Sequence, residues 1–239
     1  MGRIMKDRGS LTLAEFVFFL LVLAGIVTIG FFFIRQVDKA NEGARRASCM
    51  SNTRQIGLGM IQYAGDYDDC FPPLVDASGN MVPAVDNQGV VSNLPARSVF
   101  AVLLKQGYLT TDKVFVCPSS GERISENLPP NFITAPLNRL VLGDRNCSYG
   151  WESTKKHSAD ASCAILADKP RTTPGTEGTA ENNSENHSGE GQNVFYNDGH
   201  VKWSVTPRPD AGDDPDVYTG STAPGSEYWK STWDAKIIR

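Results

Sequence analysis

The sequence has little that would support catalysis or nucleic-acid binding. It holds only three histidines in 239 residues, and it has no Walker loop, no dinucleotide-binding glycine motif and no recognisable nucleophile motif. Its net charge is -4, so the basic face typical of nucleic-acid binders is missing. We therefore expect a protein that is not an enzyme, needs no cofactor and does not bind nucleic acid.

The five cysteines lie far apart and include no CxxC pair: Cys49, Cys70, Cys117, Cys147 and Cys163. Zinc and thioredoxin-like sites usually contain such pairs, so a metal-thiolate cluster is not expected. If the body is exported to an oxidising compartment, up to two disulfides can form and one thiol is left over. The spacing leaves every pairing open.

One long apolar run lies near the N-terminus. Residues 11–34 read LTLAEFVFFLLVLAGIVTIGFFFI, and Glu15 is their only ionisable member. A helix of this length covers roughly 36 Å, which exceeds a hydrocarbon core of about 30 Å. The preceding residues carry Arg3, Lys6 and Arg8 against a single Asp7. The positive-inside rule then predicts one span of the inner membrane, with residues 1–10 in the cytoplasm and the body outside it.

A secretory signal peptide and a plain signal anchor are the two simpler interpretations of this run. It is too long for the apolar region of a signal peptide, and FFFIRQ follows it instead of a small-x-small cleavage site. Glu15 argues against a plain anchor, because a carboxylate in an apolar span costs about 2.5–3.5 kcal/mol and needs a partner. Cleavage just before Leu11 would create an α-amino group near Glu15, and we expect that amine to be the partner.

Residues 9–15, GSLTLAE, resemble the prepilin processing motif, in which glycine precedes phenylalanine-threonine-leucine-isoleucine-glutamate. Alignment on Glu15 makes Leu11 the first mature residue and places Ser10 where glycine is usual. Cleavage after Gly9 is the alternative, and we favour the Ser10–Leu11 bond. The resemblance implies removal of the leader by prepilin peptidase, N-methylation of Leu11, and pairing of Glu15 with the N-terminal amine of a neighbouring subunit.

The same resemblance implies the partners of the chain. In pilin-like proteins the subunits assemble through their N-terminal helices. The expected partners are therefore copies of this chain, other pilins or pseudopilins, an assembly platform in the inner membrane and membrane lipid.

Beyond the apolar run, apolar residues recur at helical spacings and predict a continuous helix that ends at Gly65–Asp66. Its charged residues predict a half-buried helix with one exposed face. Residues 49–58, CMSNTRQIGL, resemble a segment of a large pilin-like (DUF1559-like) family of planctomycete-type bacteria, and aromatic residues between Tyr63 and Pro72 extend the likeness. We expect this aromatic turn to pack against the body and to have no catalytic role.

The body has weaker local signals. Residues 73–96 are rich in Pro, Gly, Asn and Asp and predict an irregular loop. Residues 97–109 predict a short helix that ends at Gly107. Strands are predicted for residues 113–118, 146–151 and 162–167.

A β-hairpin is predicted within residues 186–203, NHSGEGQNVFYNDGHVKW, because the Asp198–Gly199 pair suits a tight turn. This segment resembles the prepilin-associated motif that joins a histidine to an Asp-Gly pair, here His187 and Asp198–Gly199. The family motif has nine intervening residues, and this chain has ten.

The sequence contains two candidate metal sites. Imidazole and carboxylate groups of Asp168, His187, Asp198 and His200 could gather round an ion. However, Asp198 already has a role in the turn, and His200 is expected to face the sheet or solvent. The second candidate is Ca²⁺ on the acidic loop 210–216, because related secretion pseudopilins bind calcium through C-terminal loop carboxylates. A solvated acidic loop is the simpler interpretation.

Together these features predict an α+β, pilin-like fold in which a long N-terminal helix packs on a small antiparallel sheet. The expected organisation is a leader at 1–10, a transmembrane and assembly helix at 11–35, an amphipathic extension at 36–66 and an extracytoplasmic body at 67–239. The predicted function is that of a pilin or pseudopilin in a type IV pilus-like filament or a type II secretion pseudopilus. The alternative is an unassembled, membrane-anchored module that binds an envelope ligand or sugar.

Overall fold

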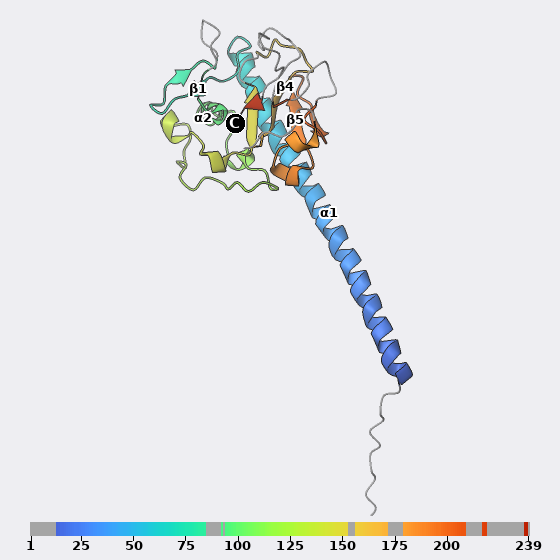
Figure 1. The fold of residues 1–239 in the computed structure, drawn as a ribbon. Helices are drawn as coiled ribbons and strands as arrows, with labels where there is room; N and C mark the ends of the chain where they lie inside the picture. The colour runs from blue at the N-terminus through green and yellow to red at the C-terminus, as the bar shows by residue number, and fades with distance from the viewer. Residues whose placement is uncertain are drawn as a thin grey trace, which may run out of the picture. The chain divides into compact units, whose positions relative to one another are not determined.

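The computed structural model divides the chain into two compact units, Met1–Gly43 and Ala44–Arg239. It describes residues 13–84, 92, 94–152, 156–171, 179–208, 217–218 and 237–238. The described residues form a long helix, a shorter one, several 3-10 turns and two antiparallel sheets (Figure 1). This arrangement confirms the predicted α+β fold.

Helix α1, Leu13–Asp66, ends where the sequence predicts. Its part in the first unit is long and apolar enough to cross a membrane. The large apolar side chains there are exposed, as in Phe18 at 64% and Phe32 at 72%. Val37, the second residue after Arg35, is also exposed at 53%.

The part of α1 in the second unit is half-buried, as predicted. Its buried residues recur at intervals of three or four: Cys49, Thr53, Ile56, Gly57, Gly59, Met60, Tyr63 and Ala64. Arg45 and Arg54 lie on the exposed face. This helix therefore supplies one wall of the core of the body.

A five-stranded antiparallel sheet, ordered β6-β5-β4-β3-β7, provides the framework of the body. Its strands are β3 Tyr149–Glu152, β4 Ala164–Asp168, β5 Gln192–Tyr196, β6 Val201–Ser204 and β7 Ile237–Ile238. Every residue of β4 and β5 is buried, so these two form the centre of the sheet. Strands β3 and β4 correspond to the strands predicted at 146–151 and 162–167, with their ends moved by one to three residues.

The turn between β5 and β6 follows the prediction. The Gly199 N–H donates to the Tyr196 carbonyl at 2.9 Å, and the Tyr196 N–H donates to the His200 carbonyl at 3.0 Å. Gly199 has φ 88°, a left-handed conformation that favours glycine. The Asp-Gly pair is therefore explained by the turn itself.

Helix α2, Val99–Gln106, also matches its prediction. Six of its side chains are buried: Val99, Phe100, Ala101, Val102, Leu103 and Leu104. The helix ends at Gly107, whose left-handed φ of 81° lets its N–H reach the Leu104 carbonyl.

The strand predicted at 113–118 is wrong. Lys113–Phe115 form a 3-10 turn instead, and Val114 and Phe115 are buried in it. A short apolar run indicates burial but does not by itself distinguish a strand from other buried structure. The core is filled here by a turn.

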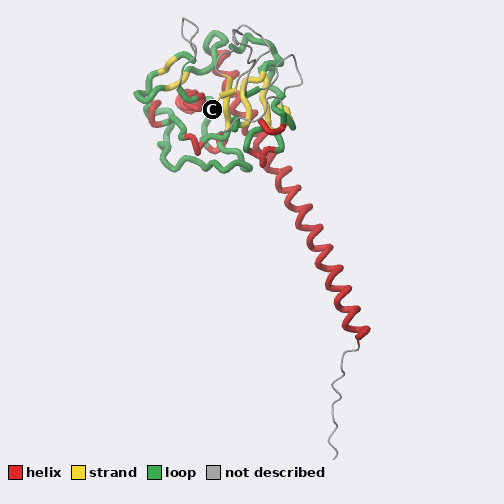
Figure 2. The backbone as a smooth tube through the Cα atoms, in the orientation of Figure 1, coloured by secondary structure: helices red, strands yellow, loops and turns green. Residues whose placement is uncertain are grey.

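The loop predicted at 73–96 contains a small hairpin of β1, Leu74–Val75, and β2, Met81–Val82. The Asp76 carboxylate organises its turn, since Oδ1 accepts the N–H groups of Ser78 and Asn80 at 2.8 Å each. Two-residue strands lie below the length at which alternation can be recognised. Loops nevertheless make up much of the body (Figure 2).

The aromatic turn after α1 packs as expected. Tyr63 stacks on Tyr67 with ring centroids 4.2 Å apart, and the edge of Tyr108 meets Tyr63 at 5.5 Å. The Tyr108 hydroxyl donates to Asp66 Oδ2 at 2.6 Å, and this hydrogen bond raises the pKa of Tyr108 to about 12. These contacts fix the end of α1 to the body.

Candidate functional site

The most unusual group in the body is the carboxylate of Asp168, which is completely buried at the end of β4. Its Oδ2 accepts the Asn193 backbone N–H at 2.7 Å and the Asn193 side-chain amide at 3.2 Å. Its Oδ1 accepts the Asn186 amide at 2.9 Å. These donors hold the carboxylate in one orientation, as a buried charge requires.

Two cysteines from distant segments face this carboxylate. Cys49 lies on α1, and its Sγ donates to Asp168 Oδ1 at 3.1 Å and lies 3.2 Å from the Tyr149 hydroxyl. Cys117 follows the 3-10 turn Lys113–Phe115. The turn that replaces the predicted strand thus delivers a second thiol to the interior.

His187 completes the group. Its Nε2 lies 3.4 Å from Cys117 Sγ and 3.7 Å from Asp168 Oδ2. The residue has φ 54° and ψ 32°, and Ser188 next to it is also left-handed at φ 57°. Such backbone is costly for residues other than glycine and persists where the surroundings impose it. Here it turns the imidazole inward, edge-on to Trp203 at 5.2 Å.

Four potential ligand atoms therefore meet inside the body, all within 4.8 Å of one another. The residues come from α1, the loop after residue 115, β4 and the loop before β5, and every one is buried. We refer to this group as the central cluster: Cys49, Cys117, Asp168 and His187.

Burial and neighbouring groups shift the pKa values of three residues of the central cluster. Burial raises the pKa of Asp168 despite the nearby imidazole and the hydrogen bonds that favour its charge. Burial also raises the pKa of Cys49 far above its usual range. In contrast, the neighbouring Cys49 and then His187 lower the pKa of Cys117 to about 7, although burial acts in the opposite direction. Cys117 is therefore the more readily ionised of the two thiols.

The structure separates the four residues of the candidate imidazole–carboxylate site into two pairs. It brings Asp168 and His187 together, whereas Asp198 and His200 lie at the hairpin turn. There Asp198 Oδ1 accepts the His200 N–H at 3.0 Å and contacts His200 Nδ1 at 2.5 Å, with both side chains about half exposed. The acidic loop 210–216 lies outside the described residues.

The sequence does not indicate Cys49 and Cys117 as ligands, because neither has a cysteine or histidine close by in the chain. Cys49 and Asp168 are 119 residues apart, and Cys117 and His187 are 70 residues apart. Cys49 belongs to the segment that resembles the pilin-like family, and His187 belongs to the histidine motif. Two of the four cluster residues therefore lie in segments that the sequence already singles out, but nothing in the sequence indicates that these segments meet.

The other predicted site lies at the N-terminus. Gly9, Ser10 and Leu11 are outside the described residues, so the cleavage site remains a prediction. Glu15 lies in the first turn of α1, where apolar side chains such as Phe16 surround it along the chain.

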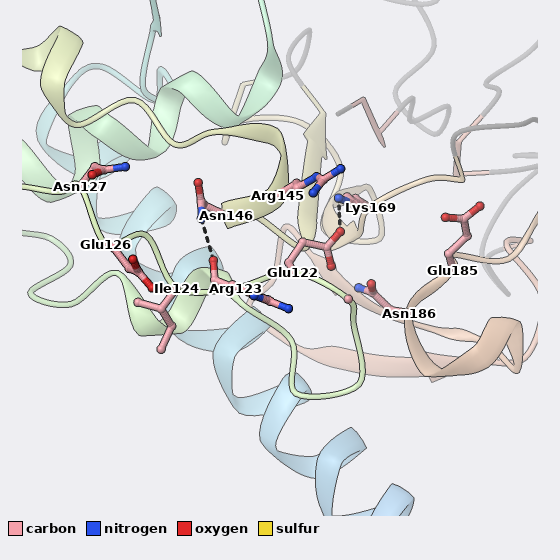
Figure 3. A pocket seen from close by; sticks show the side chains of 11 residues that line it. Glu122, Arg123, Ile124, Glu126, Asn127, Arg145, Asn146, Lys169, Glu185 and Asn186 are labelled. Carbon is pink, nitrogen blue, oxygen red and sulfur yellow. Dashed lines mark hydrogen bonds and ion pairs between the residues drawn. The ribbon is translucent and has the colours of Figure 1, made fainter.

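A surface pocket lies beside the central cluster (Figure 3). Glu122 and Lys169 form an ion pair in it, and Asn146 donates to the Arg123 carbonyl at 2.8 Å. Asn186 also lines it and links it to the Asp168 carboxylate. Side chains of both charge signs line this pocket, so it shows no preference for a ligand of one charge.

A family model described as "Protein of unknown function (DUF1559)" matches residues 38–198. The match covers most of the chain, including all four residues of the central cluster. Among curated proteins and among solved structures, none matches the chain significantly.

Proposed function

We propose that this chain, which belongs to the DUF1559 family, is a structural subunit of a type IV pilus-like filament or type II secretion pseudopilus. The observation that carries the proposal is an exposed apolar helix with one internal carboxylate, Glu15, that continues into the core of the body. In this role the chain is not an enzyme. The apolar part of α1 would move from lipid to contact with neighbouring subunits as the chain assembles.

The apolar surface of α1 requires a partner. The most apolar 18-residue stretch of α1 contains no buried residue. Exposed apolar surface of that size costs roughly 25 cal/mol per Å² in water, so it must lie in lipid or against other helices. Both environments occur in the life of a pilin, first the inner membrane and then the filament core.

Glu15 favours assembly over simple anchoring. A carboxylate in hydrocarbon is costly and serves a specific interaction when it is kept. Cleavage at Ser10–Leu11 by prepilin peptidase would supply a positive amine on a neighbouring copy. Pairing the two charges would neutralise both and fix the axial position of one subunit against the next.

Because α1 is one continuous helix, it would connect the core of a filament to the body of each subunit. The same helix that would pack among other subunits also supplies the buried wall of the body. With the basic residues of the leader in the cytoplasm, the body faces the extracytoplasmic side. The partners are then other copies, related pilins or pseudopilins and an inner-membrane assembly platform.

The alternative is an anchored module that binds an envelope ligand or sugar. It would need a site suited to one ligand, and the pocket in Figure 3 is lined by both charge signs, with Glu122 and Lys169 already paired. It also gives Glu15 no role. For these reasons we favour the filament subunit.

Processing tests the proposal. The chain would be expressed with and without prepilin peptidase, and the mass of its N-terminal peptide measured. We expect a new N-terminus at Leu11, methylated, only when the peptidase is present. An intact leader in the presence of an active peptidase that cleaves a control prepilin would contradict the proposal.

A further inference from the structure

We propose that the central cluster is a structural zinc site that fastens α1 to the body. It is formed entirely by the second unit of the chain, so this inference stands whether or not the chain assembles into a filament. Thiolate, imidazole and carboxylate are the groups that zinc uses in proteins. No other set of three or more such residues in the described part of the chain is so grouped.

The three measured separations between ligand atoms are close to those of tetrahedral coordination, and all four ligand atoms lie within 4.8 Å of one another. Zinc lies about 2.3 Å from sulfur and about 2.0–2.2 Å from nitrogen or oxygen, so ligand atoms on a tetrahedron lie ~3.3–3.8 Å apart. Cys117 Sγ and His187 Nε2 are 3.4 Å apart. Asp168 Oδ1 lies 3.1 Å from Cys49 Sγ, slightly less than this range, and the other oxygen, Oδ2, lies 3.7 Å from His187 Nε2. Small adjustments of side chains would therefore complete the site.

Neighbouring groups are placed to support a bound metal. The amides of Asn186 and Asn193 orient the carboxylate, and the Tyr149 hydroxyl lies 3.2 Å from Cys49 Sγ, where it can donate to a thiolate. Outer partners of this kind fix the direction of metal ligands. Two thiolates and one carboxylate carry three negative charges, and a divalent cation neutralises two of them.

The site has the character of a structural centre. Catalytic zinc sites keep one position open for water or substrate, whereas structural sites use four protein ligands. All four residues here are buried, with Asp168 and Cys49 fully so. A metal held in this way ties α1 to three segments far away in the sequence.

A Cys49–Cys117 disulfide is the competing arrangement, since both thiols belong to a body expected outside the cytoplasm. It would consume two zinc ligands and leave the buried carboxylate of Asp168 with the imidazole as its only charged neighbour within the cluster. Zinc uses all four groups, so it explains why the carboxylate and the inward-turned His187 lie together with the thiols.

The test uses the full chain in detergent, purified without chelator and then reduced, incubated with zinc sulfate and freed of unbound metal by gel filtration. Zinc content would be measured by mass spectrometry for wild type, C49S, C117S and H187Q. We expect one zinc per chain in wild type and loss to background in the three variants. The matched control is C147S, because Cys147 is also buried but its thiol contacts the Tyr149 carbonyl at 3.3 Å. It should keep one zinc.

Two further measurements cover variants that fail to fold. Cobalt added to the wild-type chain should give the visible and near-ultraviolet bands of tetrahedral Co²⁺ with thiolate ligands. The milder N186A change should weaken zinc affinity about 10–100-fold, the usual effect of removing an outer partner. A cobalt spectrum without thiolate bands, or equal zinc content in wild type and C49S, would overturn the site. A zinc-free chain with a Cys49–Cys117 cross-linked peptide, when isolated without reductant, would also overturn it.

Discussion

Gly57 on α1 lies directly against the ring of Phe195 on β5. A Cβ atom at position 57 would lie 2.5 Å from three carbons of that ring, which is itself completely buried. Gly59 lies two residues further along the same helix and has more space. A Cβ there would lie 3.5 Å from Leu109, an ordinary van der Waals contact. The absence of a side chain at position 57 therefore sets how closely the helix approaches the sheet.

Replacing Gly57 by alanine should destabilise the body. Overpacking costs ~1–3 kcal/mol, and the better helix propensity of alanine recovers about 0.5–1 kcal/mol of it. We expect G57A to lower the Tm of the purified chain by several degrees, measured by thermal unfolding in detergent. G59A is the matched control and should raise the Tm slightly. Equal effects of the two changes would show that the close approach to Phe195 is not important.

Gly199 is needed for its backbone conformation rather than for space. A Cβ there would approach only Leu58, at 3.9 Å, but φ is 88°. We expect G199A to cost about 1–2 kcal/mol of unfolding free energy, measured by denaturant titration. G121A is the control, since nothing lies within 4 Å of a Cβ at position 121. Zinc content should be unchanged in both variants, because the turn is separate from the central cluster.

The ion pair of Glu122 and Lys169 predicts a pH dependence. Its side chains are only 13% and 12% exposed. Although burial opposes ionisation, the hydrogen bond from Lys169 holds the pKa of Glu122 below its usual value. The folded state thus favours the charged carboxylate, so the stabilisation is complete above the unfolded pKa of about 4.3 and is lost as pH falls through the lower folded pKa.

We therefore expect E122Q to lower stability by about 1–3 kcal/mol at pH 7 and to differ little from wild type in acid below the folded pKa. Thermal unfolding from pH 7 downward would measure this. E126Q, on the rim of the same pocket, should match wild type at pH 7. A Tm difference between E122Q and wild type that stays constant over the whole pH range would contradict the assignment.

The sequence predicts the parts of this fold that depend on local signals. The end of α1 at Asp66, the stop of α2 at Gly107 and the Asp-Gly turn each depend on residues close together in the chain. The strand predicted at 113–118 is wrong because a short apolar run indicates burial and not conformation. Its actual form depends on the core that Val114 and Phe115 fill.

Only two of the four residues of the central cluster could be predicted as ligands from the sequence. The sequence indicates Asp168 and His187 as candidate ligands but not Cys49 and Cys117, because neither cysteine has a nearby cysteine partner. Their proximity depends on how α1 packs against the sheet and on the turn before residue 117. Both are long-range features, which spacing along the chain does not encode.

Assembly tests the central claim most directly. Wild type, E15A and T28A would be produced together with prepilin peptidase and the assembly machinery, and filaments would be sheared from the cells and analysed for the chain. Thr28 is the control, because it is polar, lies in the same apolar run and donates a local hydrogen bond to the Gly25 carbonyl at 2.8 Å. We predict that wild type and T28A appear in the filament fraction, whereas E15A is processed but stays in the membrane. Recovery of E15A in filaments at the wild-type level, or absence of the wild-type chain from them, would contradict the account.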